Sequence, residues 1–200
     1  MKALRIVLGF LPFLVFSILA PVVGAGWSAA AGTLVAVVVV LATARDGIQI
    51  PPAAQGSILL VMAVLGFTGG PGVNAFLTQY GPGLCGVLLG YFLVATAATM
   101  PFTAQIARAS VPAQFWHSPR FLEVNRRISN AWGLAVMVLG FCHVAGAEIS
   151  GGGGALGLRL ALNWVVPILV FWRVRAYSNR VAADAQHAAA AHGSHERTGS

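Results

Sequence analysis

Few side chains within the long apolar segments of this chain are of the types that do acid–base or metal chemistry. His143 is the only histidine inside such a segment. An ionisable residue at membrane depth is a candidate functional group, so His143 could act as a proton relay, a metal or haem ligand, or a buried hydrogen-bond donor. A haem held between helices would need a second histidine facing the first, and no other apolar segment carries one. We therefore predict no metal and no cofactor, and a neutral, hydrogen-bonded His143.

Three further polar residues follow His143 toward the C-terminus. Glu148 and Arg159 flank a glycine-rich loop, so they could form an ion pair, or Arg159 could extend alone to the membrane surface. Asn163 lies within the last apolar segment, where an amide typically links two helices by a hydrogen bond. With His143 these residues form a polar cluster that is too small to indicate an active site. No catalytic residue is predicted.

Motifs of common enzymes and transporters are absent from the sequence. It contains no phosphate-binding glycine loop, no HExxH zinc motif, no GxSxG nucleophile motif and no CxxC pair. No acidic residue lies in an apolar segment, which argues against a transporter coupled to protons or sodium. A small-solute channel or transporter with a polar path near His143 and Asn163 stays open as the alternative function. A membrane enzyme with His143 as its base ranks third.

The densest group of arginines occurs in the polar segment 101–127, between two apolar segments. A basic cluster beside a membrane attracts anionic lipid, by about 1 kcal/mol for each arginine, and can also dock a protein partner. Trp116 and His117 accompany the arginines. The candidate residues for lipid or partner contact are Arg108, Arg120, Arg126, Arg127 and Trp116.

Composition identifies the class of protein that must position these residues. Hydrophobic residues make up 58% of the 200 residues and charged residues only 8%, and the mean hydropathy is +0.80. Soluble domains carry about 25% charged residues, so this composition indicates a lipid-facing surface. The net charge of +7 does not indicate nucleic-acid binding, because the arginines fall in the gaps between apolar segments. We predict an all-α transmembrane bundle that contacts membrane lipids and could also bind a membrane-protein partner or form a homo-oligomer.

Six apolar segments are long enough to be helical spans of the bilayer, or nearly so. The first apolar segment follows basic residues, as a signal peptide does. It contains Pro12, however, and is longer than the apolar region of a signal peptide, which favours a retained first helix. The predicted spans are about 3–23, 27–44, 57–69, 82–100, 128–147 and 156–172, joined by a connector at 101–127 and followed by a polar, disordered tail at 177–200.

Basic residues also predict the orientation of the bundle. Eleven of the twelve lie before the first span, after the second, in the connector or after the sixth, and only Arg159 lies on the other side. Lysine and arginine accumulate on the cytoplasmic side of membrane proteins, so both termini are predicted to be cytoplasmic. We expect the protein in the cytoplasmic (inner) membrane of a bacterium.

Local signals add detail at three places. The glycine-rich stretch near residue 70 predicts a loop over 69–81, or alternatively a broken helix followed by an interfacial segment. In the connector, apolar residues from Phe102 recur at helical spacing, and Ser118-Pro119 is a good start for the next helix. Gly86 and Gly90 have the spacing that allows two membrane helices to pack closely.

A short motif in the fifth span resembles a known family. The sequence RRISNAW from Arg126 to Trp132, followed by Gly140, is similar to a segment of the intracellular septation protein A family of small bacterial inner-membrane proteins. The FLPF sequence at 10–13 is similar to the opening of that family's first helix. The resemblance implies a role in cell-envelope maintenance or division, through partners and without catalysis.

The chain also departs from that family's pattern. The family favours asparagine where Ser129 and His143 stand here, and it has fewer spans. The glycine-rich loop and the histidine-rich tail have no counterpart in it. The function predicted from the sequence is accordingly a non-enzymatic envelope protein that works through its basic connector.

Overall fold

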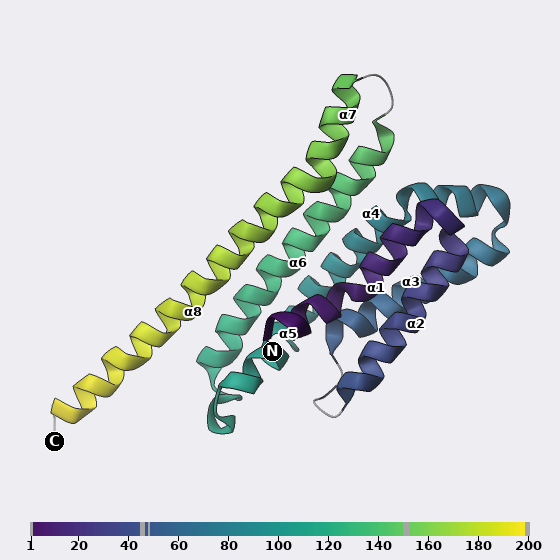
Figure 1. The fold of residues 1–200 in the computed structure, drawn as a ribbon. Coiled ribbons are helices and arrows are strands. Elements are labelled where there is room, and N and C mark those ends of the chain that lie inside the picture. The colour runs from purple at the N-terminus through teal and green to yellow at the C-terminus, as the bar shows by residue number, and fades with distance from the viewer. Residues whose placement is uncertain (1, 45–46, 48, 150–152, 199–200) are drawn as a thin grey trace.

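The computed structural model describes residues 2–44, 47, 49–149 and 153–198, and this part of the chain is helical and contains no β-strand (Figure 1). The predicted all-α fold is therefore confirmed. The helices are α1 (Lys2–Val23), α2 (Ala25–Thr43), α3 (Ile50–Thr68), α4 (Gly70–Ala97), α5 (Phe102–Ala107), α6 (Pro119–Glu148), α7 (Gly153–Leu160) and α8 (Val166–Thr198). Two 3₁₀ turns, Arg108–Ser110 and Ala113–Phe115, lie between α5 and α6, and a π-helical turn, Ala161–Val165, joins α7 to α8.

Five helical stretches of the described chain are long and apolar enough to cross a membrane: α2, α3, α4, α6 and the continuous stretch Ala155–Ala185. In α1 the stretch Gly9–Val23 is also apolar. Length and composition thus agree with a membrane-embedded bundle.

The helices are unequally packed. Phe16, Leu59, Leu89 and Leu93 are almost fully buried in the core formed by α1, α3 and α4. The α8 helix packs along α6 at the edge of the bundle, and no residue in the most apolar part of Ala155–Ala185 is buried (Figure 1). The apolar surface of this last hairpin is available to lipid.

Within the core, α1 is held to α3 by an inserted side-chain amide. The ring of Pro12 interrupts the hydrogen-bond ladder of α1. Gln55 fills the gap, since the Phe13 N–H donates to Gln55 Oε1 at 3.0 Å and Gln55 Nε2 donates to the Gly9 carbonyl oxygen at 2.8 Å. Gln55 is fully buried. Its amide satisfies two backbone groups that would otherwise be unpaired in an apolar interior.

The segment 69–81 differs from the favoured sequence prediction, which was a loop. It is helical, because α4 runs continuously from Gly70 to Ala97 with Pro82 inside it. In Figure 1 the first turns of α4 cross the upper end of the bundle before the helix descends beside α6. This helical segment is closer to the alternative prediction, a broken helix followed by an interfacial segment.

Side chains of this first part of α4 explain why it is ordered. The chain turns between α1 and α2 at Gly24, whose φ is +80°. The first N–H groups of α2 lack helical partners, and α4 supplies them: Ala25 N donates to Thr78 Oγ1 at 3.0 Å and Gly26 N donates to Asn74 Oδ1 at 3.1 Å. Tertiary capping therefore overrides the local preference of glycine and proline for a loop.

The closest helix pair is α4 with α6, and glycines bring it together. A Cβ atom at Gly86 would lie 3.0 Å from the Cα atom of Gly140, and one at Gly90 would lie 2.5 Å from the carbonyl oxygen of Gly133. Only glycine permits such an approach of two helix backbones. Gly86 and Gly90 thus lie in the most extensive interface of the bundle.

Two further boundaries can be compared with the sequence. The predicted start of the fifth long helix is confirmed, because Pro119 opens α6 and the Ser118 hydroxyl accepts a hydrogen bond from the Phe121 N–H at 3.2 Å. The polar tail from residue 177 was expected to be a short helical continuation followed by a disordered end, and α8 runs on to Thr198. This part is rich in alanine, the strongest helix former, which explains the difference.

Candidate functional site

The arginines singled out in the sequence lie at the polar end of the α6–α8 pair. Beyond their apolar stretches the two helices stay together over residues 119–130 of α6 and 173–185 of α8, which we call the polar stalk. Arg120 Nη2 donates to the carbonyl oxygen of Ala185 at 2.6 Å. At the base of the stalk Trp132 Nε1 donates to Ser178 Oγ at 3.1 Å, and the Trp132 and Phe171 rings meet edge to face with centroids 5.3 Å apart.

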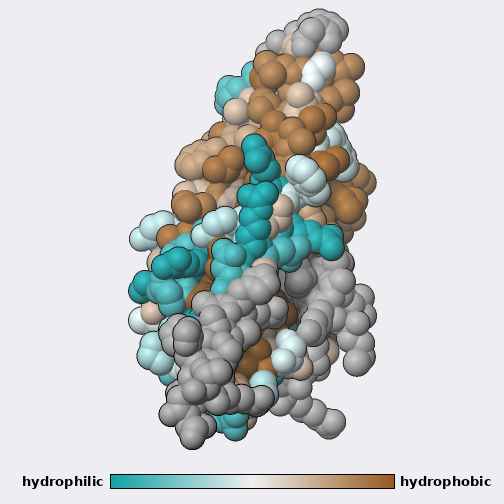
Figure 2. Space-filling view, turned by 90° about the vertical axis from the view of Figure 1, so that its left-hand side faces the viewer, coloured by the Kyte–Doolittle hydropathy of each residue, from teal (hydrophilic) through white to brown (hydrophobic). Residues whose placement is uncertain are grey.

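Hydrophilic residues gather at this end of the molecule. Figure 2 shows them below a broad hydrophobic region that covers the upper part of the surface in view. The stalk thus begins where the apolar surface of the bundle ends. A boundary of this kind is what a protein presents at the surface of a bilayer.

Two of the connector arginines are paired with one carboxylate. Arg126 lies 2.5 Å and Arg127 lies 2.7 Å from Glu123, measured between side-chain nitrogen and oxygen. The hydrogen bond from Arg127, together with the charge of Arg126, holds the pKa of the Glu123 carboxyl below its usual value. The positive charge of these two arginines is therefore partly neutralised within the protein.

Arg108 and Trp116 contact each other within the connector. The Arg108 guanidinium lies 5.3 Å from the centre of the Trp116 ring, which is a cation–π distance. Trp116 Nε1 also donates to the Val111 carbonyl oxygen at 2.7 Å. These contacts fold the connector back on itself, so Arg108 also has a partner in its own chain.

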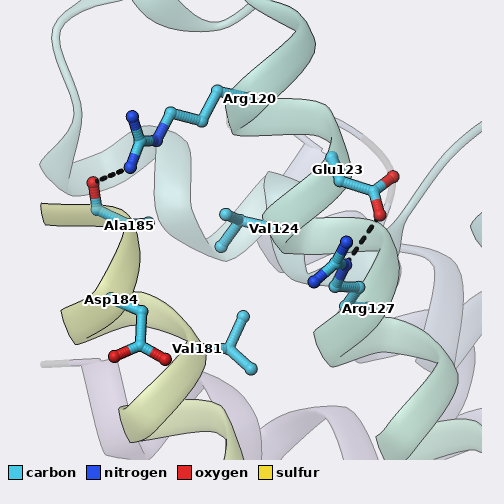
Figure 3. A pocket seen from close by; sticks show the side chains of 7 residues that line it. All are labelled: Arg120, Glu123, Val124, Arg127, Val181, Asp184 and Ala185. Atoms are coloured by element: carbon cyan, nitrogen blue, oxygen red, sulfur yellow. Dashed lines mark hydrogen bonds and ion pairs between the residues drawn. The ribbon is translucent and has the colours of Figure 1, made fainter. Parts of the chain in front are cut away.

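A groove opens between the two helices of the stalk (Figure 3). Its volume is about 260 Å³. In Figure 3 Arg120 reaches across to the α8 backbone, while Val124 and Val181 approach each other between the charged residues. The groove is lined by Arg120, Glu123, Val124, Arg127, Val181, Asp184 and Ala185. It offers an apolar floor with charges of both signs at its edge.

A buried polar contact that the sequence analysis missed docks the connector on α6. The Thr103 hydroxyl lies 2.9 Å from Ser129 Oγ and donates to the Asn125 carbonyl oxygen at 2.9 Å. Ser129 is fully buried and Asn125 is 5% exposed. The signal that could have found them is their spacing of four residues, which places both on one face of α6. They fix the start of the connector relative to the stalk.

At the opposite end of the bundle the polar residues predicted to cluster are only partly together. Tyr80 donates a short hydrogen bond to Glu148 Oε1, and Gln79 Nε2 donates to the Ala147 carbonyl oxygen at 3.2 Å. The ion pairs found among the described residues all involve Glu123, so Glu148 is bonded to Tyr80 and forms no ion pair with Arg159. Arg159 is exposed, as expected for the alternative in which it extends outward.

Asn163 lies within the π-helical turn and faces α6. A Cβ atom at Gly146 would lie 3.0 Å from Asn163 Nδ2. Asn163 Oδ1 is buried and lacks a hydrogen-bond partner among the described residues. His143 is half-buried on α6, one turn before Gly146. The amide therefore packs at the α6–α8 contact, and the predicted interhelical hydrogen bond of its oxygen is not formed in this part of the chain.

No group of three or more histidine, cysteine, aspartate or glutamate residues lies close enough to hold a metal ion within the described ranges. Cys85 is buried and Cys142 is half-buried, and both are free thiols. Comparisons with protein-family models, with curated proteins and with solved structures found no match. The case for a function therefore rests on the residues and their geometry.

Proposed function

We propose that this chain is a non-enzymatic, six-span protein of the bacterial cytoplasmic membrane that acts in cell-envelope maintenance or division by docking a partner at its polar stalk. The observation that supports it is the groove between α6 and α8, which lies at the end of the molecule where the basic residues gather. The similarity of RRISNAW to the septation protein A family supports the same process. Both termini and the connector lie on the cytoplasmic side in this proposal, in keeping with the positive-inside rule.

The groove has the character of a docking surface. Val124 and Val181 offer apolar contact, while Arg120 and Asp184 at its edge can recognise charged groups of either sign. The stalk is also held by few contacts, chiefly those of Arg120 and Trp132. A partner that bridges α6 and α8 would add to them.

The channel alternative has less support. Backbone contact at Gly86 and Gly90 leaves no room for a polar path between α4 and α6. Asn163 faces Gly146 at the α6–α8 contact, at the edge of the bundle. We therefore do not propose transport.

A chromosomal replacement in the bacterium that makes this protein tests the proposal. Val181→Arg fills the groove with a charged side chain, whereas Asn179→Arg adds the same residue two positions away, where the surface is exposed and outside the groove. We expect Val181→Arg to reproduce the cell-length and septum-spacing defect of a deletion strain, and Asn179→Arg to behave like the unaltered strain. Equal amounts of both variants in the membrane fraction are the control. A Val181→Arg strain that divides normally, beside a deletion strain that does not, would show that the groove is not the docking site.

A further inference from the structure

The arginines of the connector and of the polar stalk fall into two groups by their contacts. The arginines of the connector and of α6 each have a partner within the protein. Arg108 contacts the ring of Trp116, and Arg120 bonds to the carbonyl oxygen of Ala185. Arg126 and Arg127 both pair with Glu123. Those at the start of the α8 part of the stalk, Arg173, Arg175 and Arg180, are exposed and take part in no ion pair or hydrogen bond with another described residue. Their charges are free to meet an outside ligand.

The arginines of α6 and those of α8 also differ in the direction of their side chains, because the two helices run in opposite directions. Side chains of an α-helix lean toward its N-terminus. The α6 helix enters the apolar region from the stalk, so its arginines lean away from that region. The α8 helix leaves the apolar region and enters the stalk, so its arginines lean back toward it (Figure 1).

The three α8 arginines are also exposed close to the end of the apolar stretch. Trp172, 67% exposed, marks the end of the apolar stretch, and Arg173 and Arg175 follow within about 5 Å along the helix axis. A headgroup layer of about 5–7 Å borders each side of the hydrocarbon core. Phe171 faces α6, so Arg173, about 200° farther around the helix, points away from it, and Arg180 lies on the same face as Arg173 but about 12 Å beyond Trp172. Arg175 lies about 40° from Phe171, on the side of the helix toward α6, and its side chain is exposed there.

We propose that Arg173, Arg175 and Arg180, which lie around more than one side of α8, bind the phosphate groups of anionic phospholipids, with the exposed ring of Trp172 against an acyl chain. The proposal rests on the orientation given under the proposed function, but not on the groove. It replaces the connector by α8 as the lipid-contacting element. The connector arginines then serve to hold the connector and the stalk together.

Native mass spectrometry of the full chain in a neutral detergent, titrated with phosphatidylglycerol, measures the site directly. We compare the triple variant R173Q/R175Q/R180Q with R120Q/R126Q/R127Q, which loses the same three charges from α6. Each free arginine contributes about fivefold to the affinity for an anionic surface, so the α8 variant should bind phosphatidylglycerol roughly tenfold to a hundredfold more weakly. The α6 variant should change by no more than about twofold, since its arginines already have partners. Zwitterionic phosphatidylcholine should bind all three proteins equally.

Three outcomes of the comparison between the variants would overturn the proposal. They are an equal loss in both triple variants, a larger loss in the α6 variant, and unchanged binding in the α8 variant. Displacement of the lipid by soluble glycerol phosphate at equal concentration would also overturn it, because the site would then bind free phosphate. Each of these results leaves the Val181→Arg division assay unaffected, so the lipid site and the proposed docking function can fail separately. Matching helical circular dichroism of the three proteins shows that the variants are folded.

Discussion

At the scale of single residues, the most consequential side chain is one that the sequence did not single out. Gln55 is a lone amide in an apolar helix, and its importance depends on Pro12, which lies in a different helix and far away in the sequence. The sequence alone predicts a gap in the hydrogen-bond ladder of α1 at Pro12, because proline has no backbone N–H. Which side chain fills the gap depends on how α1 and α3 are aligned, and no local pattern gives that alignment.

Gln55→Leu keeps the size of the side chain but removes both hydrogen bonds to α1. The Gly9 carbonyl and the Phe13 N–H would then be left unpaired in the core, and a buried unpaired group costs about 1–3 kcal/mol. We expect the free energy of unfolding in detergent to fall by about that amount. Gln114→Leu, at an exposed position of the connector, is the matched control and should have little effect. Equal stability of the two variants would contradict the role given to Gln55.

Glu123 provides a prediction about pH. Its pKa is lowered in the folded protein by Arg127 and Arg126, so its favourable contribution is fully present above the pKa of the unfolded carboxyl. That contribution is lost as the pH falls through the lower, folded pKa. Arg127→Gln removes the largest cause, and we expect the pKa of Glu123 to rise toward the usual glutamate value, as measured by carboxyl-carbon NMR. Arg173→Gln, which removes an arginine that does not bond to Glu123, should leave it unchanged. A Glu123 pKa that stays the same in Arg127→Gln would show that the ion pair does not form in solution.

At the scale of elements, the sequence predicted those helices whose signals are local. The start of α6 is one of them, because the Ser118 cap and Pro119 lie side by side in the sequence. The first part of α4 was wrongly favoured as a loop, since its order comes from capping of α2 by Asn74 and Thr78, which is a tertiary effect. The tail was expected to continue α8 as a short helix, and its alanine content favours the longer helix that runs to Thr198.

The attachment of α8 to α6 is less extensive than the packing of α6 on α4, and it depends on Trp132. The indole both bonds to Ser178 and meets the ring of Phe171. Trp132→Ala removes both contacts, so we expect α8 to separate from α6 more often and its amides over 173–185 to exchange hydrogen faster. Trp164→Ala removes a tryptophan that is 67% exposed and serves as the control. Unchanged exchange in Trp132→Ala would mean that other contacts hold the stalk together.

At the scale of the whole molecule, composition alone predicted a helical membrane protein, because so few charges can cover only a small water-exposed surface. The basic segments were predicted to share one side of the membrane, and the arrangement of the helices agrees with that grouping. In Figure 1 the start of α1, the last turns of α8, the connector, the end of α2 and the start of α3 lie toward one end of the bundle, and the end of α1, the start of α4 and the start of α7 lie toward the opposite end. The candidate site could be predicted only as a set of arginines, since their partners in α8 and in the connector depend on the fold.

Six spans with both termini in the cytoplasm make a prediction that labelling can test. Gly72 and Gln114 are exposed at opposite ends of the bundle, and a Cβ atom at Gly72 would meet no other atom within 4 Å. In a background that carries Cys85→Ala and Cys142→Ala, we expect a membrane-impermeant maleimide to label Gly72→Cys in intact spheroplasts and Gln114→Cys only after permeabilisation.

A tag placed before Met1 completes that test, because it reports on whether α1 crosses the bilayer. If α1 crosses the bilayer, external protease removes the tag only after permeabilisation, as for the connector. If α1 does not cross, the tag lies on the same side as Gly72 and is removed from intact spheroplasts, which leaves five spans. Pro12 and Gln55 favour the first result, since a helix whose broken ladder is repaired by a buried amide of α3 is part of the bundle and shares its depth.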